Sequence, residues 1–105
     1  MDEVGMFTDQ QNFLNLKEKP ARLSRQEVAW MLRFTEDDIT MLVSAGALKP
    51  LGKPAKNAPK WFARVDIERL KENAAWLARA TEIVRKAWEE RNKSRKKSSG
   101  LLVGA

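Results

Sequence analysis

The 105-residue sequence contains no cysteine and no histidine. Without cysteine the chain can form neither a disulfide nor a thiolate metal site, and without histidine the only side chains left to bind a metal are carboxylates. These two residue types are also the commonest nucleophile and general base in enzymes. We therefore expect a protein that is not an enzyme and that has no metal, no cofactor and no small-molecule ligand.

The sequence also lacks a long apolar run. Although 43% of the residues are hydrophobic, no stretch approaches the ~20 residues of a membrane span. The first twenty residues carry Asp2, Glu3, Asp9 and Glu18 and have neither the basic start nor the apolar block of a secretory signal. The length suits one small domain with a modest core. We expect a soluble cytoplasmic protein.

Positive charge is abundant and unevenly distributed. The net charge is +6, and two blocks without any acidic residue hold most of the excess: Lys49, Lys53, Lys56, Lys60 and Arg64 in the first, and Arg91, Lys93, Arg95, Lys96 and Lys97 in the second. Separate basic blocks are the electrostatic footprint of a polyanion partner. The alternative interpretation is a solvated loop and a solvated tail.

Two helix starts lie eleven residues apart. Ser24 with Glu27, and Thr35 with Asp38, have the spacing of a capping box, and Gly46 is placed to end the second helix. Each helix has an apolar stripe at helical spacing. The stripes comprise Val28, Ala29 and Leu32, followed by Ile39, Leu42 and Val43. The pattern predicts two short helices joined by a tight turn at Arg33 and Phe34.

The pattern changes after the second helix. Residues 48–51 and 60–63 are two short strand candidates, and Gly52, Pro54, Asn57 and Pro59 between them favour turns. We expect a two-stranded wing with a basic tip. Trp61 and Phe62 point to opposite faces of the second strand, so one of them should anchor the wing in the core.

Nothing in the sequence breaks a helix from Arg64 to about Arg91. Its later apolar residues form two adjoining stripes, and a helix this long exceeds what a domain of this size can cover. We expect these residues to form a homodimer interface: Trp76, Leu77, Ala80, Ile83, Val84, Ala87 and Trp88. The alternative is that the helix folds back on the N-terminal arm of the same chain. Residues 93–105 have the composition of a disordered basic tail.

Residues 1–20 form an N-terminal arm. Thr8 with Gln11 could cap a short helix over residues 9–17, although a mobile arm is an equally good interpretation. Trp30 lies on the outer side of the first helix, where we expect the arm to cover it in preference to a partner.

The segments 23–29, 44–50, 61–62 and 66–70, together with Thr35, resemble the winged helix-turn-helix of the MerR and excisionase group. The small subunit of phage terminases is similar. The resemblance covers about half of the chain and implies a second helix laid in the DNA major groove, a wing that reaches the backbone or minor groove, and a C-terminal helix that pairs antiparallel across a dimer.

Two positions depart from the group. Arg33 stands at a turn where the group often has glycine, which would cost something like 1 kcal/mol if the backbone there needs a positive φ. The exposed start of the second helix is Glu36-Asp37-Asp38, where the group usually offers Arg, Ser or Tyr to DNA. These carboxylates suit the positive end of the helix dipole, but phosphates would repel them.

The predicted fold is mainly α, a winged helix-turn-helix with a two-stranded wing and a long C-terminal helix. Its parts are the arm (1–20), the winged domain (21–70), a dimerisation helix (71–92, continuous with 64–70) and the tail (93–105). The expected function is binding of double-stranded DNA, as a small dimeric regulator or a phage-type architectural or packaging factor. The expected DNA-binding residues are Arg25, Thr40, Lys49, Lys53, Lys56, Lys60, Arg64, Lys93, Arg95, Lys96 and Lys97. The alternative is a protein-interaction adaptor that kept the fold and lost DNA binding.

Overall fold

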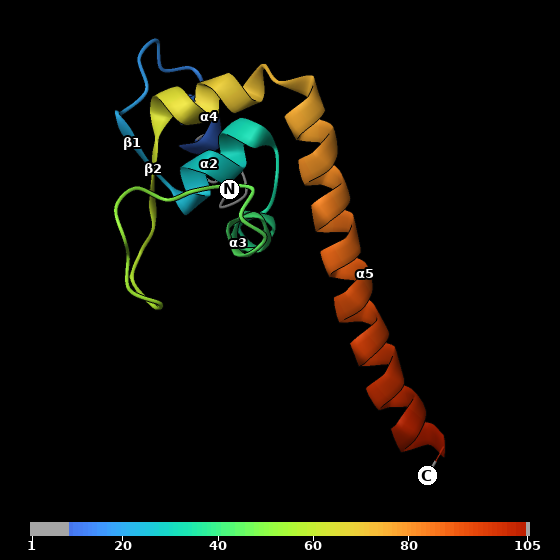
Figure 1. Cartoon of the computed structure of the whole chain (residues 1–105). Coiled ribbons are helices and arrows are strands. Elements are labelled where there is room, and N and C mark those ends of the chain that lie inside the picture. The colour runs from blue at the N-terminus through green and yellow to red at the C-terminus, as the bar shows by residue number, and fades with distance from the viewer. Residues whose placement is uncertain (1–8, 105) are drawn as a thin grey trace.

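The computed structural model describes the backbone of residues 9–104 and the side chains of residues 9–94. A helical segment at residues 9–14 precedes six elements: β1 (Arg22–Ser24), α2 (Arg25–Leu32), α3 (Glu36–Ser44), β2 (Trp61–Ala63), α4 (Arg64–Lys71) and α5 (Ala74–Gly104). The chain is mainly helical, with a small antiparallel sheet and a long C-terminal helix (Figure 1). Across the described residues, no helix combines the length and the apolar character that crossing a membrane requires.

Both predicted capping boxes are present. The Ser24 hydroxyl accepts from the Glu27 amide at 3.2 Å, and the Glu27 carboxylate accepts from the Ser24 amide at 2.9 Å. Thr35 and Asp38 repeat the pair at 3.1 and 3.0 Å. Each box satisfies amides that a helix start leaves without a partner. Consequently α2 and α3 begin where the sequence predicts, and only residues 33–35 separate them.

The turn between α2 and α3 depends on a left-handed residue. Arg33 has φ 63° and ψ 41°, and the amides of Arg33 and Phe34 both donate to the Ala29 carbonyl. The sequence predicts a strained turn if the backbone at Arg33 has a positive φ, and the structure has that φ. An L side chain in this conformation is strained. After α3, Gly46 supplies a second positive φ, of 79°.

The core forms where α2, α3, α4 and the inner face of the sheet meet. The largest side chains with almost no exposure are Leu23, Val28, Ile39, Leu42, Phe62 and Ile67. They include members of both predicted helical stripes. Of the aromatic pair on β2, Phe62 is 1% exposed and Trp61 is 38% exposed. The prediction that one of the two anchors this strand in the core is thus confirmed.

The predicted pairing of the wing strands is wrong. β2 pairs with β1, so that Leu23 lies opposite Phe62, and residues 48–51 are not a strand. One backbone bond joins that segment to β2, from the Leu51 amide to the Trp61 carbonyl at 2.7 Å. Pro50 has no amide to donate and Gly52 turns the chain at φ 68°, so a ladder cannot continue there.

The predicted continuous helix over residues 64–92 is also wrong. α4 ends at Lys71, and α5 begins at Ala74. The Asn73 side chain accepts from the Trp76 amide at 3.0 Å, because asparagine is better suited to capping a new helix than to a helix interior. The chain changes direction at this joint (Figure 1).

The joint directs α5 against α3 of its own chain. Trp76, Ala80 and Val84 are buried, and α5 contacts α3 and α4. Two indole N–H groups hold it there: Trp76 donates to the Ala47 carbonyl at 3.1 Å, and Trp88 donates to the Asp38 carboxylate at 2.7 Å. Because Ala47 follows the end of α3 and Asp38 lies in its first turn, the docked part of α5 spans α3 from one end to the other.

This packing corrects the predicted dimer interface. Trp76, Ala80 and Val84 face the chain's own core and are not available to a second copy, while Leu77, Ile83 and Trp88 are partly buried against the same core and Ala87 is half-buried. The alternative, a helix folded back on the N-terminal arm, does not describe the packing on α3 and α4 either. Homodimerisation stays a prediction, but the large exposed apolar surface on α5 that led us to expect it is mostly covered by the chain itself.

The structure also bears on the predictions for the N-terminal arm and the C-terminal tail. Phe13 is buried and its ring centroid lies 5.7 Å from that of Trp30, so the arm covers Trp30 as expected; Thr8, its predicted cap, lies outside the described residues. The tail was expected to be disordered, but α5 continues to Gly104. Lysine and arginine are good helix formers.

The strained turn yields a stability prediction. Arg33→Gly should raise the free energy of unfolding by about 0.5 to 1 kcal/mol, because relief of left-handed strain exceeds the entropic cost of glycine. Arg79→Gly, at an exposed position inside α5, is the control and should lower stability by about 1 kcal/mol. Urea unfolding measures both, and equal losses would contradict a strained Arg33.

A second prediction concerns the anchor between α3 and α5. Trp88→Phe and Asp38→Ala should each destabilise the protein, and the double variant should lose less than the sum, with a coupling of about 0.5 to 3 kcal/mol. The loss from Trp88→Phe should be about 1.5 to 3 kcal/mol, since the lost bond ends on a charged group.

The control cycle combines Asp38→Ala with Trp76→Phe, whose N–H has a different acceptor. Its effects should be additive, because Trp76 lies about three turns of α5 away from the contact between Trp88 and Asp38. Additive effects in both cycles would show that the indole of Trp88 is not coupled to Asp38.

Candidate nucleic-acid interface

The exposed side of α3 lies between two other parts of the chain. On one side is the loop of residues 49–60, here called the basic loop, which projects from the body; on the other is α5 (Figure 1). Ala55 and Ala58 close the tip of the basic loop through a backbone bond of 3.0 Å. The Lys60 ammonium donates to the Lys56 carbonyl at 3.4 Å, so the two lysines share one side of the tip.

A groove of about 860 Å³ separates α3 from the basic loop. Its wall on the helical side includes Arg25, Glu36 and Thr40, and its wall on the loop side includes Lys56 and Lys60. We call this the loop groove. It brings together four of the predicted DNA-binding residues from three separate parts of the sequence.

A second groove, of about 420 Å³, separates α3 from α5. It is lined by Asp37, Thr40, Met41 and Ser44 of α3 and by Ile83, Ala87 and Arg91 of α5, among others. We call this the α5 groove. Thr40 and Ser44 line both grooves, so the exposed face of α3 is a ridge with a hollow on each side.

Each carboxylate at the start of α3 has a partner inside the chain. Arg25 contacts Glu36 at 3.2 Å, Arg91 lies 4.0 Å from Asp37, and Asp38 accepts the Trp88 indole N–H. The Asp38 side chain is buried, so it does not face a ligand. The acidic start of α3 is therefore partly neutralised before any partner binds.

Arg25 ties the start of α2 to two turns of α3. Its Nε donates to Glu36 Oε1 at 3.3 Å, and its Nη1 donates to the Thr40 hydroxyl at 3.0 Å. The Thr40 hydroxyl in turn donates to the Glu36 carbonyl at 3.2 Å. The three side chains form one hydrogen-bonded cluster on the wall of the loop groove.

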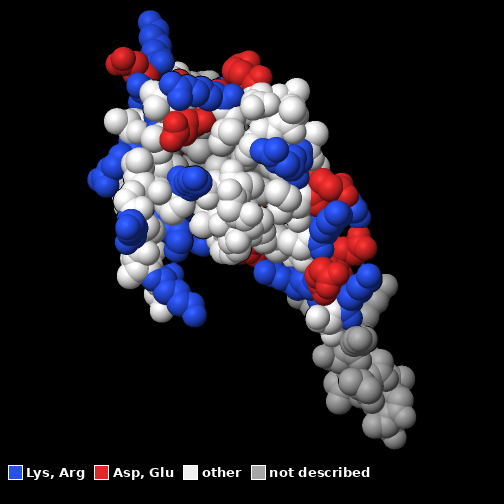
Figure 2. Space-filling view, in the orientation of Figure 1, with Lys and Arg blue, Asp and Glu red and all other residues white. Residues whose placement is uncertain are grey.

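None of the other predicted residues whose side chains are described lines the loop groove. Lys49 and Lys53 are exposed on the basic loop, where Figure 2 shows Lys and Arg on a projecting part of the surface. Arg64 was predicted to bind DNA, but its guanidinium donates to the Lys19 carbonyl at 3.0 Å and its backbone amide to Ala21. It therefore fastens the segment before β1 and does not line either groove. The side chains of Arg95, Lys96 and Lys97 lie outside those described.

Arg91 is the site residue that sequence reasoning missed. Its guanidinium lies 4.7 Å from the centroid of the Trp88 ring and lines the α5 groove. The spacing of three residues between Trp88 and Arg91 was a usable signal for the contact within α5. Its position beside Asp37 follows only once α5 is known to pack on α3.

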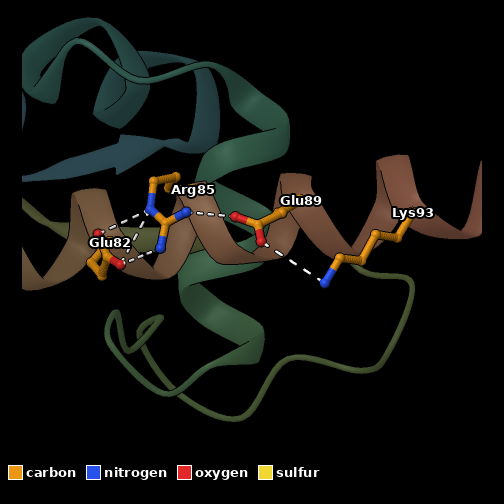
Figure 3. A network of polar contacts seen from close by, with 4 residues as sticks. All are labelled: Glu82, Arg85, Glu89 and Lys93. Carbon is orange, nitrogen blue, oxygen red and sulfur yellow. Dashed lines mark hydrogen bonds and ion pairs between the residues drawn. The ribbon is translucent and has the colours of Figure 1, made fainter.

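The outer side of α5 carries its own ionic network. Arg85 bridges Glu82 and Glu89, and Lys93 lies 4.0 Å from Glu89 (Figure 3). The bonds from Arg85 hold the pKa of the Glu82 carboxyl below its ordinary value, and the same contacts raise the pKa of Arg85. These carboxylates are thus paired along α5, and they line neither groove. Lys93 is partly engaged by this network.

Comparisons with known proteins gave no relative. No protein-family model matches the chain, and neither the curated proteins nor the solved structures searched include a match.

Proposed function

We propose that this chain binds double-stranded DNA with α3 laid in the major groove, in the manner of a winged helix-turn-helix protein. The observation that carries the proposal is the pair of grooves that flank α3. A helix in the major groove has a phosphate strand on each side, and an exposed helix without hollows beside it could not approach the bases.

The charges beside α3 fit this arrangement. The loop groove presents Lys56 and Lys60 to one phosphate strand, and the α5 groove presents Arg91 to the other. The ion pairs of Glu36 with Arg25 and of Asp37 with Arg91 reduce the repulsion between the acidic start of α3 and the phosphates. Such contacts position a protein on the duplex without reading its sequence.

The end of α5 supplies a further contact in this proposal. Trp88 is the last residue of α5 whose indole is bonded to the body, and the helix continues for sixteen residues from there to Gly104. At ~1.5 Å per residue this part of α5 is about 24 Å long. We call it the C-terminal extension. Its basic sequence suits a phosphate strand beyond the reach of α3. A regulator and an architectural or packaging factor would both use such contacts.

The second candidate function is a protein-interaction adaptor, and the lining of the loop groove favours it. Beside its charged residues the groove has apolar walls, with Val43 from α3, Pro54 and Pro59 from the basic loop, and Trp61 from β2. A pocket with apolar walls and a few polar groups also suits a peptide. DNA binding is preferred because the rim of the groove is basic.

Salt dependence of binding to a generic duplex separates the two candidates. If Lys56, Lys60, Arg91 and two or three further residues of the C-terminal extension each neutralise a phosphate, log K should fall against log salt with a slope near −5. Removing residues 93–105 should make the slope shallower by about two units. Fluorescence anisotropy of a labelled duplex at several salt concentrations measures the slope.

The control for this titration is a matched loss of charge. Replacing Lys56 and Lys60 with alanine should weaken binding and flatten the slope by about two units. Replacing Lys71 and Lys86 with alanine removes the same charge at exposed positions that line neither groove, and it should have a much smaller effect. Absence of binding at ~50 mM salt, where non-specific contacts are strong, would favour the adaptor.

A separate experiment tests whether α3 enters the groove. The Asp37 side chain is 66% exposed, and Asp37→Asn should tighten non-specific binding about two- to fivefold, because a negative charge close to phosphate is removed. Asp66→Asn, in the first turn of α4, makes the same change away from both grooves. Equal effects from the two variants would mean that α3 does not approach the phosphates.

A further inference from the structure

We infer that Arg25 and Glu36 together recognise a G·C base pair from the major groove, with Arg25 on the guanine and Glu36 on the cytosine. The inference rests on the proposed function and adds a sequence preference to it. It follows from the hydrogen-bond groups that the cluster of Arg25, Glu36 and Thr40 leaves open toward the loop groove.

The donors of Arg25 are only partly used. A guanidinium has five N–H groups, and the contacts to Glu36 and Thr40 engage at most three of them. The Arg25 side chain is 49% exposed. The remaining N–H groups can donate to a ligand while the existing contacts hold the side chain in place. Guanine N7 and O6 are the acceptors that arginine most often contacts in the major groove.

The acceptors of Glu36 are only partly used as well. Both contacts from Arg25 end on Oε1, and the side chain is 44% exposed. Oε2 therefore remains to accept a hydrogen bond, and a carboxylate can only accept. In the major groove cytosine presents an amino donor beside the acceptors of its paired guanine.

The order of donor and acceptor disfavours the other kind of base pair. With adenine at Arg25, the adenine amino group would face a donor and thymine O4 would face the Glu36 carboxylate. With thymine at Arg25, O4 could accept one hydrogen bond, but thymine has no second acceptor in place of guanine N7, so the bidentate contact is lost. Thr40 adds no competing donor, because its hydroxyl already accepts from Arg25 and donates to the Glu36 carbonyl. The side chains are fixed before binding, so little conformational entropy is lost on contact.

Selection from a pool of duplexes with a randomised centre tests the inference. The wild-type protein should enrich G·C at one position, and exchange of that pair for A·T in a single duplex should weaken binding roughly 5- to 150-fold, which corresponds to the discrimination expected of one good base contact. Glu36→Gln and Arg25→Lys should both lose this preference. Arg25→Lys keeps the charge but not the planar fork, so its non-specific affinity should remain.

Glu68→Gln is the matched control, because Glu68 is an exposed carboxylate that pairs with Arg64 on α4. It should keep the wild-type preference, and thermal unfolding should confirm that all variants are folded. Binding without a preference, a preference for another pair, or one that survives both variants overturns the inference and leaves the proposed function standing. Failure of the wild type to bind any duplex overturns the proposed function, and the inference falls with it.

Discussion

The carboxylate of Asp38 is the point on which the arrangement of the helices depends. One oxygen accepts from the Thr35 amide and completes the cap of α3, and the other accepts from the Trp88 indole. Burial of a charged group is tolerable only when such partners replace water. A single side chain thereby defines where α3 begins and where the docked part of α5 ends, and it aligns the two helices that enclose the α5 groove.

Local features of the fold could be predicted because their causes lie within a few residues. Both capping boxes, the strained turn at Arg33 and the apolar stripes depend on spacings that the sequence displays directly. The pairing of β2 could not be predicted in the same way, since residues 48–51 and 22–24 are both plausible neighbours by composition. What decided it was burial of Leu23 opposite Phe62, a contact between residues far apart in the chain.

The same distinction between local and long-range causes separates the site residues that could be predicted from those that could not. The residues Arg25, Thr40, Lys56 and Lys60 were expected from charge and position, and they line one groove. Arg64 belonged to the same basic block, yet its side chain binds the Lys19 carbonyl. Charge in a sequence identifies what could meet an anion, but the direction of each side chain depends on tertiary contacts. The same limit applies to the pairing of Asp37 with Arg91, which requires α5 to lie beside α3.

The two tryptophans that anchor α5 fix the number of residues between them, but not the number of residues that follow. Trp76 and Trp88 must both meet acceptors at opposite ends of α3, and one residue inserted between them would rotate the second indole by about 100° around the helix. Insertions or deletions in that interval should therefore be incompatible with docking. Beyond Arg91, which lies beside Asp37, no ion pair or indole hydrogen bond among the described side chains joins α5 to α3, so related sequences could lengthen or shorten the C-terminal extension by whole turns while the body stays unchanged. The length of α5 after its anchored part is accordingly the feature of this fold that can vary most freely during evolution.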